Sequence, residues 1–227
     1  SEMASVIGKR EDAAYYKDLF EAIKKHFCEL YVRDGRLTEK SQTACILALH
    51  MQLVDGQLKE NVKEDLQNNI VKNGYRLSTG FIGTSLLLPV LSEHGMERLA
   101  YRLLLQEENP SWLYSVNQGA TTIWERWDSY TKENGFHENG MNSFNHFSYG
   151  SVGQWMYEDL LGIQYIPTQS PDYQFVIAPQ VLIDEKEGIG ECRGFYDSPL
   201  GKIGMHWKNI DGGVVYQVEI PANTKGK

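Results

Sequence analysis

Before Gly162, apolar residues recur with the period of an α-helix. The clearest stripe advances by four and three residues in turn, which places all of its members on one face of a helix: Tyr16, Phe20, Ile23, Phe27 and Leu30. Shorter stripes of the same kind run over residues 58–70 and 96–104, and a last helix is expected over residues 151–161. These stretches predict helices that bury one side only.

Two other stretches, residues 43–54 and 84–91, are apolar on nearly every side. A helix of that kind must be covered all round, and Pro89 must start, kink or end the second one. Alternation of fully buried and one-sided helices is typical of an α/α toroid, in which inner helices sit inside a ring of outer ones. A helical solenoid would alternate similarly, but no fixed-period repeat is present. An irregular all-α domain stays open on pattern alone.

After Gly162 the period changes to two. Apolar and polar residues alternate over 202–208 and again over 214–220, on either side of the Asp211–Gly212 turn. This pattern predicts an antiparallel hairpin with one face buried. A second turn at 198–201 adds a preceding strand, and we expect a small β-domain of roughly five strands.

The period switch divides the chain. We expect helices up to about Leu161, a linker or first turn around Pro167 and Pro171, and β-structure from about Tyr173. The predicted domains are residues 1–162, mainly α, and residues 163–227, antiparallel β.

Composition excludes several classes of protein. The net charge is −8 and no basic stripe is present, so nucleic acid is not an expected partner. No stretch approaches the roughly 18 apolar residues of a membrane span, and no membrane partner is expected. Cys28, Cys45 and Cys192 lie far apart without metal-ligand spacing, which favours small buried hydrophobes over disulfides or zinc. Neither a metal nor another cofactor is expected.

Residues 119–150 do not behave like scaffold, because they form a long stretch with little periodicity and many aromatic residues. Flat aromatic faces beside carboxylates and amides are what a sugar site needs. Glu125 lies between Trp124 and Trp127, whose rings would desolvate the carboxylate and favour its neutral form. His146 is placed to donate to a sugar hydroxyl. The structural alternatives are a loop of core aromatics, an ion pair of Glu125 with Arg126, and a purely structural histidine.

The same region resembles a known family, the bacterial α-L-rhamnosidases of glycoside hydrolase family 78. The resemblance spans roughly Ala13 to Asn223 and rests on motifs in matching order: LSTGFIGT at 77–84, PSWLY at 110–114, GATTIWERWD at 119–128, GMNSFNH at 140–146 and VEIPAN at 218–223. GATTIWERW is the most specific of them.

The resemblance implies a fold and a mechanism. The fold is an (α/α)6 toroid, of which this chain would hold the C-terminal part, followed by an antiparallel β-sandwich. The activity is hydrolysis of terminal α-L-rhamnosyl residues with inversion by two glutamates. The glutamate of the WERW motif is the general base, so Glu125 inherits that role. His146 inherits a substrate contact, and we expect Asn145, Trp124 and Trp127 to line the same pocket.

One part of the family pattern is missing. The general acid of the family lies in the first half of the toroid, upstream of any residue here, and no residue in this chain matches its motif. We therefore expect the chain to carry the general-base half of the site and to be inactive alone. Glu125 and His146 are predicted to face one concavity with Trp124 or Trp127 in its wall.

Three hypotheses about function remain at this point. The first is the C-terminal part of an inverting α-L-rhamnosidase acting on a rhamnose-containing glycoside or polysaccharide. The second is a non-catalytic carbohydrate-binding or structural module, and the third is a toroid glycosidase for another sugar. The sequence leaves open the aglycone, the oligomeric state, and whether the parent protein is periplasmic, secreted or cytoplasmic.

Overall fold

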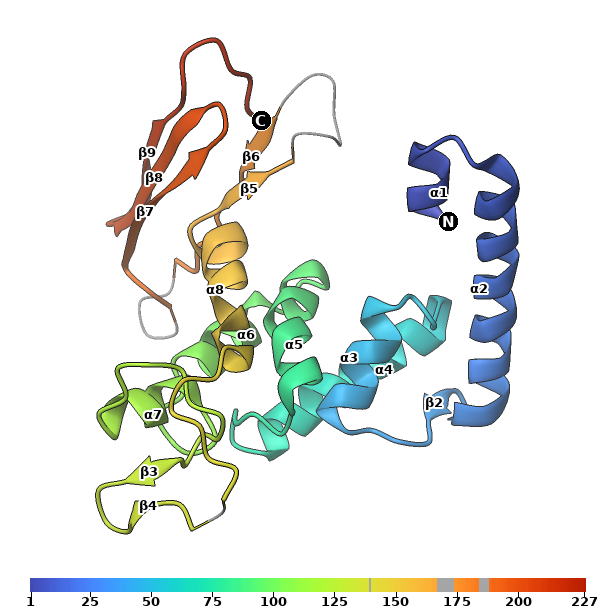
Figure 1. Cartoon of the computed structure of the whole chain (residues 1–227), viewed down its shortest axis with the longest axis horizontal. Helices are drawn as coiled ribbons and strands as arrows, with labels where there is room; N and C mark the ends of the chain where they lie inside the picture. The colour runs from blue at the N-terminus through green and yellow to red at the C-terminus, as the bar shows by residue number, and fades with distance from the viewer. Residues whose placement is uncertain (139, 167–173, 184–187) are drawn as a thin grey trace. The chain divides into compact units, whose positions relative to one another are not determined.

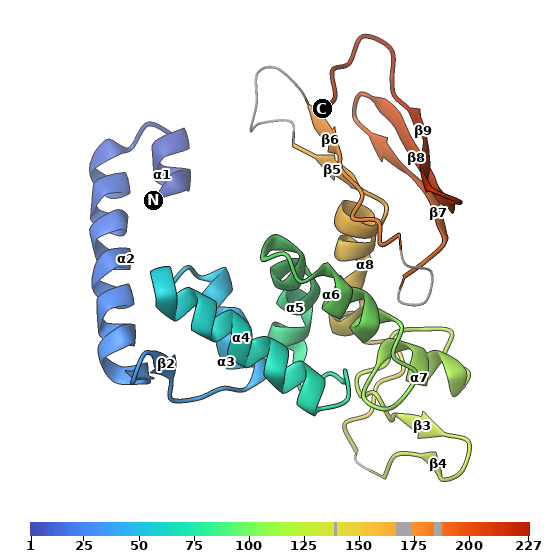
Figure 2. The same ribbon diagram turned by 180° about the vertical axis from the view of Figure 1, so that it is seen from behind.

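The computed structural model describes residues 1–138, 140–166, 174–183 and 188–227. They form two compact units, residues 1–69 and 70–227, which are considered separately. Figures 1 and 2 show the elements of both from opposite sides.

The first unit is helical apart from one small hairpin. Its elements are α1 (Glu2–Val6), α2 (Arg10–Tyr31), β1 (Val32–Arg33), β2 (Arg36–Leu37), α3 (Gln42–His50) and most of α4 (Gly56–Lys72). Two residues with positive φ, Asp34 and Gly35, make the tight turn of the hairpin. The Asn61 side chain of α4 donates a hydrogen bond of 2.8 Å to the Gly35 carbonyl, so the turn is fastened to that helix.

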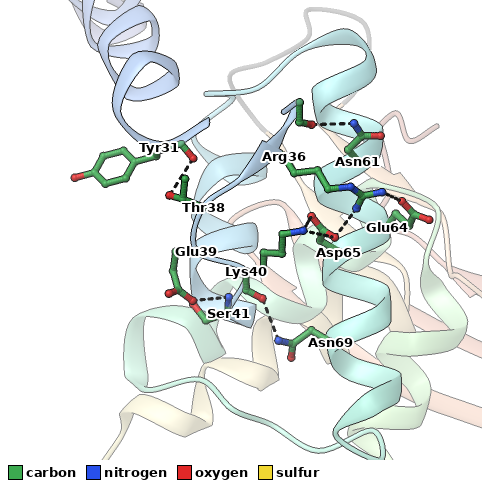
Figure 3. Close-up of polar contacts among 11 residues, drawn as sticks. Tyr31, Arg36, Thr38, Glu39, Lys40, Ser41, Asn61, Glu64, Asp65 and Asn69 are labelled. Atoms are coloured by element: carbon green, nitrogen blue, oxygen red, sulfur yellow. Dashed lines mark hydrogen bonds and ion pairs between the residues drawn. The ribbon is translucent and has the colours of Figure 1, made fainter. Parts of the chain in front are cut away.

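An ion-pair cluster fastens the same hairpin more firmly (Figure 3). The Arg36 guanidinium donates to Asp65 at 2.5 Å and also to Glu64, both on α4. The Lys40 ammonium lies 3.3 Å from the other Asp65 oxygen. Asp65 is buried, whereas the Glu64 side chain is 57% exposed. Asp65 therefore links α4 both to β2 and to the segment that leads into α3.

The helical periodicities predicted for this unit are confirmed, but one of the stripes is not buried. Val62, Leu66 and Ile70 of α4 are inaccessible to solvent, as their spacing predicts. The stripe of α2 is about half exposed, 51% at Tyr16 and 52% at Ile23. Helix formation follows from local periodicity, whereas burial needs a covering partner.

The thiols fit the prediction of small hydrophobic residues in part. Cys45 on α3 has no exposed surface, and burial raises its pKa to about 12. Cys28 and Cys192 are only half-buried, and all three cysteines are free thiols.

The helices of the second unit are α5 (Phe81–Glu93), α6 (Glu97–Leu104), α7 (Trp112–Asn117) and α8 (Val152–Trp155). α8 is flanked by the 3₁₀ turn η1 (Ser148–Ser151) and the π-helical turn η2 (Met156–Leu160), so the predicted helix over 151–161 is irregular. Pro89 neither starts nor ends α5 but lies inside it. Burial of α5 side chains such as Leu87 and Leu91 stabilises the helix despite the lost hydrogen bond.

The strands form small antiparallel sheets. β3 (Tyr130–Thr131) pairs with β4 (Gly135–Phe136), and β5 (Ile163–Tyr165) pairs with β6 (Phe175–Ile177). β7 (Glu191–Ser198), β8 (Gly201–Ile210) and β9 (Gly213–Glu219) form one sheet in that order, as Figure 1 shows. The first strand after the helices thus starts at Ile163, earlier than expected. Tyr173, Pro167 and Pro171 lie outside the described residues.

The predicted hairpin and both of its turns are present, but its apolar face is buried on one strand only. On β8, Ile203, Met205 and Trp207 are at most 2% exposed. On β9, Tyr216 is 50% and Val218 is 46% exposed. The expectation of a buried face is therefore wrong for β9, because the packing that covers β8 does not extend over this strand, which among the described strands lies at the sheet edge beside β8.

The β-strands are tied to the helices by specific contacts. The Trp207 indole donates to the Leu160 carbonyl at 2.7 Å. At Gly162, which has a φ of +84°, an added Cβ would lie 2.2 Å from the Pro179 nitrogen, so only glycine allows this approach. The Gln180 side chain donates to the Asp159 carboxylate at 2.9 Å.

Removal of the Asp65 charge is expected to destabilise the first unit. Asp65→Asn leaves the charges of Arg36 and Lys40 without their buried counter-ion, and should lower the melting temperature by roughly 3–6 °C. Glu64→Gln is the matched control, because its exposed pair contributes little. Thermal unfolding followed by circular dichroism measures both, and equal effects would contradict the assigned role of Asp65.

Asp159 makes stability depend on pH in the opposite direction from a salt-bridged carboxylate. Burial raises its pKa to about 6, Glu158 and Glu97 add to the shift, and the Ser92 hydroxyl opposes it. The folded state therefore favours the neutral acid. This contribution is fully present below pH 4 and is lost as the pH rises through 6.

Asp159→Asn should accordingly stabilise the fold at pH 7.5, by about 1–2 kcal/mol, and have little effect near pH 4. The asparagine keeps an oxygen that accepts from Gln180. Urea denaturation at both pH values measures the difference from wild type, with the exposed Glu93→Gln as control. A difference that does not change with pH would refute this account.

Candidate active site

The loop over residues 119–150 is closed by paired backbone segments. Glu125 donates its N–H to the Ser143 carbonyl at 2.8 Å, and the Ser143 N–H donates to the Glu125 carboxylate, also at 2.8 Å. A second backbone bond joins the same segments two residues before Glu125 and three residues after Ser143, where the His146 N–H donates to the Ile123 carbonyl at 2.9 Å. These bonds bring the WERW motif and the Asn-His motif side by side, although 18 residues separate Glu125 from Ser143.

Aromatic side chains of the loop and of α7 pack together and support the loop. The Trp127 indole stacks on Tyr149 with ring centroids 3.9 Å apart and 17° between the planes, and meets Trp112 edge-on at 5.5 Å. The Trp112 indole donates to the Tyr149 carbonyl at 2.9 Å. Burial raises the pKa of the Tyr149 phenol, which therefore stays neutral. The predicted alternative of core aromatics is thus correct for part of the loop.

Glu125 and Trp127 line one concavity of about 380 Å³. Its other lining residues are Phe81, Arg126, Asp128, Met141 and Tyr149. Glu125 is half-buried, and the Ser143 N–H occupies only one of its two carboxylate oxygens. Its carboxylate can therefore accept a further hydrogen bond from a water molecule or a substrate.

The ion pair proposed as an alternative role for Glu125 is not formed within the described residues. Arg126 instead lies 3.5 Å from Asp128, and Asp128 lies 3.8 Å from His137. This arrangement keeps the guanidinium engaged elsewhere and leaves the Glu125 carboxylate without a cationic partner in the described part of the chain.

His146 lies next to Phe81, one of the residues that line the concavity. It stacks on Phe81 with a centroid distance of 4.6 Å and an interplanar angle of 17°, and Phe147 lies parallel to it at 5.6 Å. Its Nδ1 faces the Ser148 N–H at 3.4 Å. With Nδ1 as the acceptor, the proton is on Nε2, which is then the donor. His146 itself is not among the lining residues.

The remaining predicted residues lie elsewhere. Trp124 is 7% exposed, packs edge-on against Phe144 at 5.2 Å, and lines a second, apolar hollow of about 310 Å³ with Trp112 and Trp127. Asn145 is exposed, and its backbone N–H donates to the Ser143 hydroxyl at 3.2 Å. Of the two tryptophans, only Trp127 shares the concavity of Glu125.

Residues that the sequence reasoning did not select also shape the concavity, above all Phe81 and Tyr149. Phe81 begins α5 inside the 77–84 motif, and Tyr149 is among the aromatic residues of the loop. The available signals were the position of Phe81 in the 77–84 motif and the aromatic composition of the loop that contains Tyr149. No group of three or more potential metal ligands occurs in the described residues, and no described helix is long and apolar enough to cross a membrane.

Comparison with known families identifies the chain. The family described as the bacterial alpha-L-rhamnosidase 6 hairpin glycosidase domain matches residues 1–160, and the bacterial alpha-L-rhamnosidase C-terminal domain matches residues 162–227. The chain belongs to the bacterial α-L-rhamnosidase family. The fold class predicted from the sequence, part of a six-hairpin toroid followed by antiparallel strands, is thereby confirmed.

Individual α-L-rhamnosidases agree with this family assignment. The chain is 40% identical over 223 residues to an α-L-rhamnosidase of Formosa agariphila and 42% identical to one of Streptomyces avermitilis. Among solved structures, that of the Streptomyces avermitilis α-L-rhamnosidase complexed with L-rhamnose superposes with a TM-score of 0.89 at 40% identity, over 99% of this chain. The Aspergillus terreus α-L-rhamnosidase superposes with the same score at 30% identity.

The chain is much shorter than these rhamnosidases. It covers 23% of the Formosa agariphila protein and 21% of the Streptomyces avermitilis protein, while nearly all of the chain is matched in each case.

Proposed function

We propose that this chain contributes the general-base half of an α-L-rhamnosidase site, in which terminal α-L-rhamnosyl residues of a glycoside or polysaccharide are hydrolysed with inversion. The observation that carries the proposal is the position of Glu125. Its carboxylate lies in an aromatic concavity, is held by the Ser143 N–H, and keeps one oxygen for a water molecule. Membership of a rhamnosidase family supplies the class of sugar.

In the proposed step, the chain orients the Glu125 carboxylate toward a water molecule. The Ser143 N–H fixes the direction of the Glu125 carboxylate, whose other oxygen accepts a proton from water as that water attacks the anomeric carbon. The leaving-group oxygen takes its proton from a second carboxylic acid, which in an inverting enzyme stands roughly 6.5–9.5 Å from the base. We assign that acid to a part of the toroid outside residues 1–227. The reaction requires no cofactor.

Trp127 and His146 are the proposed sugar contacts. The Trp127 ring, held by Tyr149 and Trp112, presents a rigid apolar wall for the C–H face of a pyranose. His146, with its proton on Nε2, is the proposed donor to a rhamnose hydroxyl. Its ring stacks on Phe81, which lines the concavity. Asn145 and Trp124 are further from the carboxylate, and we propose supporting roles for them at the rim.

The domain organisation is part of the proposal. We propose that residues 1–162 complete the C-terminal portion of an α/α toroid and that residues 163–227 form a separate β-domain. The ranges of the two family matches, residues 1–160 and 162–227, support the division. The half-exposed stripe of α2 supports the partial toroid, because an unfinished ring leaves apolar helix faces without a cover.

The role of Glu125 is tested by Glu125→Gln in the full-length enzyme that carries this chain. The amide keeps the shape of the side chain but cannot accept a proton, so kcat should fall by roughly 10²–10⁴-fold while KM changes little. An aryl α-L-rhamnoside is a suitable substrate. Glu133→Gln, in the same loop but exposed, is the control and should retain wild-type turnover.

Assay of the 227-residue chain by itself tests where the acid lies. It should be essentially inactive on an aryl α-L-rhamnoside, because the chain holds no proposed donor for the leaving group. Robust turnover would place the acid within residues 1–227 and contradict the proposed division of the site. If the full-length enzyme is also inactive while rhamnose binds, the non-catalytic module is the better interpretation. If it hydrolyses a different glycoside, the third hypothesis is favoured.

A further inference from the structure

The sheet of β7, β8 and β9 carries a hollow that the proposed hydrolysis does not use. It has a volume of about 400 Å³ and lies on the face of the sheet opposite to the buried residues Ile203 and Trp207. Its lining residues are Arg193, Gly194, Phe195, Lys202, Gly204, Met205, His206, Gln217 and Glu219.

The strand register explains why the sheet is hollowed here. Gly204 on the central strand pairs with Phe195 on one side and with Glu219 on the other, so the middle of this row has no side chain. A Cβ on Gly204 would come within 3.2 Å of the Glu219 Cβ and 3.3 Å of its carboxylate. The floor of the hollow is therefore peptide backbone, with a phenyl ring and a carboxylate as its two walls.

The next row on the same face of the sheet, two residues further along β8, supplies polar groups to the same hollow. Arg193, His206 and Gln217 are register partners across the three strands. His206 is engaged, because it lies 2.7 Å from Glu191. In the described part of the chain, no ion pair or side-chain hydrogen bond engages Arg193, Gln217 or Glu219. Three planar groups thus offer donors and acceptors to solvent around the hollow, Arg193 from β7 and Gln217 and Glu219 from β9.

The exposed aromatic ring completes the arrangement. Phe195 is 50% exposed, and the Lys202 ammonium lies 4.4 Å from its ring centroid. A flat apolar ring beside planar, bidentate hydrogen-bonding groups suits a pyranose, which has an apolar C–H face and vicinal hydroxyls at its edge. An apolar ligand would leave these polar groups unpaired.

We propose that this hollow is a carbohydrate-binding site that takes one pyranose unit of a saccharide chain. The sugar ring packs on Phe195 above the Gly204 backbone, and its hydroxyls pair with Arg193, Gln217 and Glu219. The site binds without catalysing a reaction, and it would keep a polysaccharide on the protein whether or not Glu125 is a general base.

Phe195 and Tyr216 provide a matched pair of variants. Both rings are 50% exposed, and they lie on opposite faces of the same sheet, in register rows three residues apart along β8. Phe195→Ala removes the proposed platform and should weaken saccharide binding about tenfold. Tyr216→Ala removes an equally exposed ring from the other face and should leave binding within about twofold of wild type. Gln217→Ala is a second variant that spares the aromatic ring.

The experiment is titration of the ¹⁵N-labelled 227-residue chain with L-rhamnose and with a rhamnose-containing oligosaccharide, followed by amide shifts. Shifts at Gly204 and Gln217 that weaken in Phe195→Ala and persist in Tyr216→Ala are the expected result. Their absence in the wild type, or their survival in Phe195→Ala, would overturn the proposal. Shifts confined to Ser143 and His146 would overturn it too while supporting the site at Glu125.

Discussion

The reciprocal hydrogen bonds between Glu125 and Ser143 are the constraint on which the candidate site depends. One bond joins the backbones, and the other joins the Ser143 N–H to the carboxylate that would do the chemistry. The same contact therefore closes the loop and aims the side chain. Together with the bond from the His146 N–H to the Ile123 carbonyl, this contact orders the WERW and Asn-His motifs in the folded chain. The conformational entropy of assembling the two motifs is therefore lost on folding and not on substrate binding.

The aromatic residues under the loop serve structure and site together. Trp127 stacks on Tyr149, and the ring centroids of Tyr149 and Phe81 are 5.0 Å apart. The walls of the concavity therefore belong to one packed cluster. His146 is held against the same cluster through Phe81. Rigid walls of this kind let a sugar ring bind without first ordering the side chains. The rings that form the packed core of the loop are thus the same rings that we propose contact the sugar.

The β-strands are anchored by few but buried contacts. Trp207 reaches the last helical turn, Gly162 allows Pro179 to approach, and Asp159 accepts from Gln180. Among the described residues, none of these anchors lies on the opposite face of the sheet, and it is there that Gly204 leaves a hollow beside Phe195. A sheet with one anchored face and one hollowed polar face is suited to presenting a ligand site without disturbing the helices.

The sequence by itself determined the period of each element and the change from helix to strand near Gly162. It also contains the motifs, with Glu125 and His146 among them, by which the chain resembles the rhamnosidase family. Periodicity is local, since side-chain positions repeat every 3.6 or 2 residues whatever surrounds them. Tertiary structure decided which faces are buried. It left the stripe of α2 half exposed and the face of the edge strand β9 accessible, and it placed Trp127 but not Trp124 in the concavity of Glu125. Burial and cavity lining depend on residues distant in sequence, and a local pattern carries no information about which partners are present to cover it.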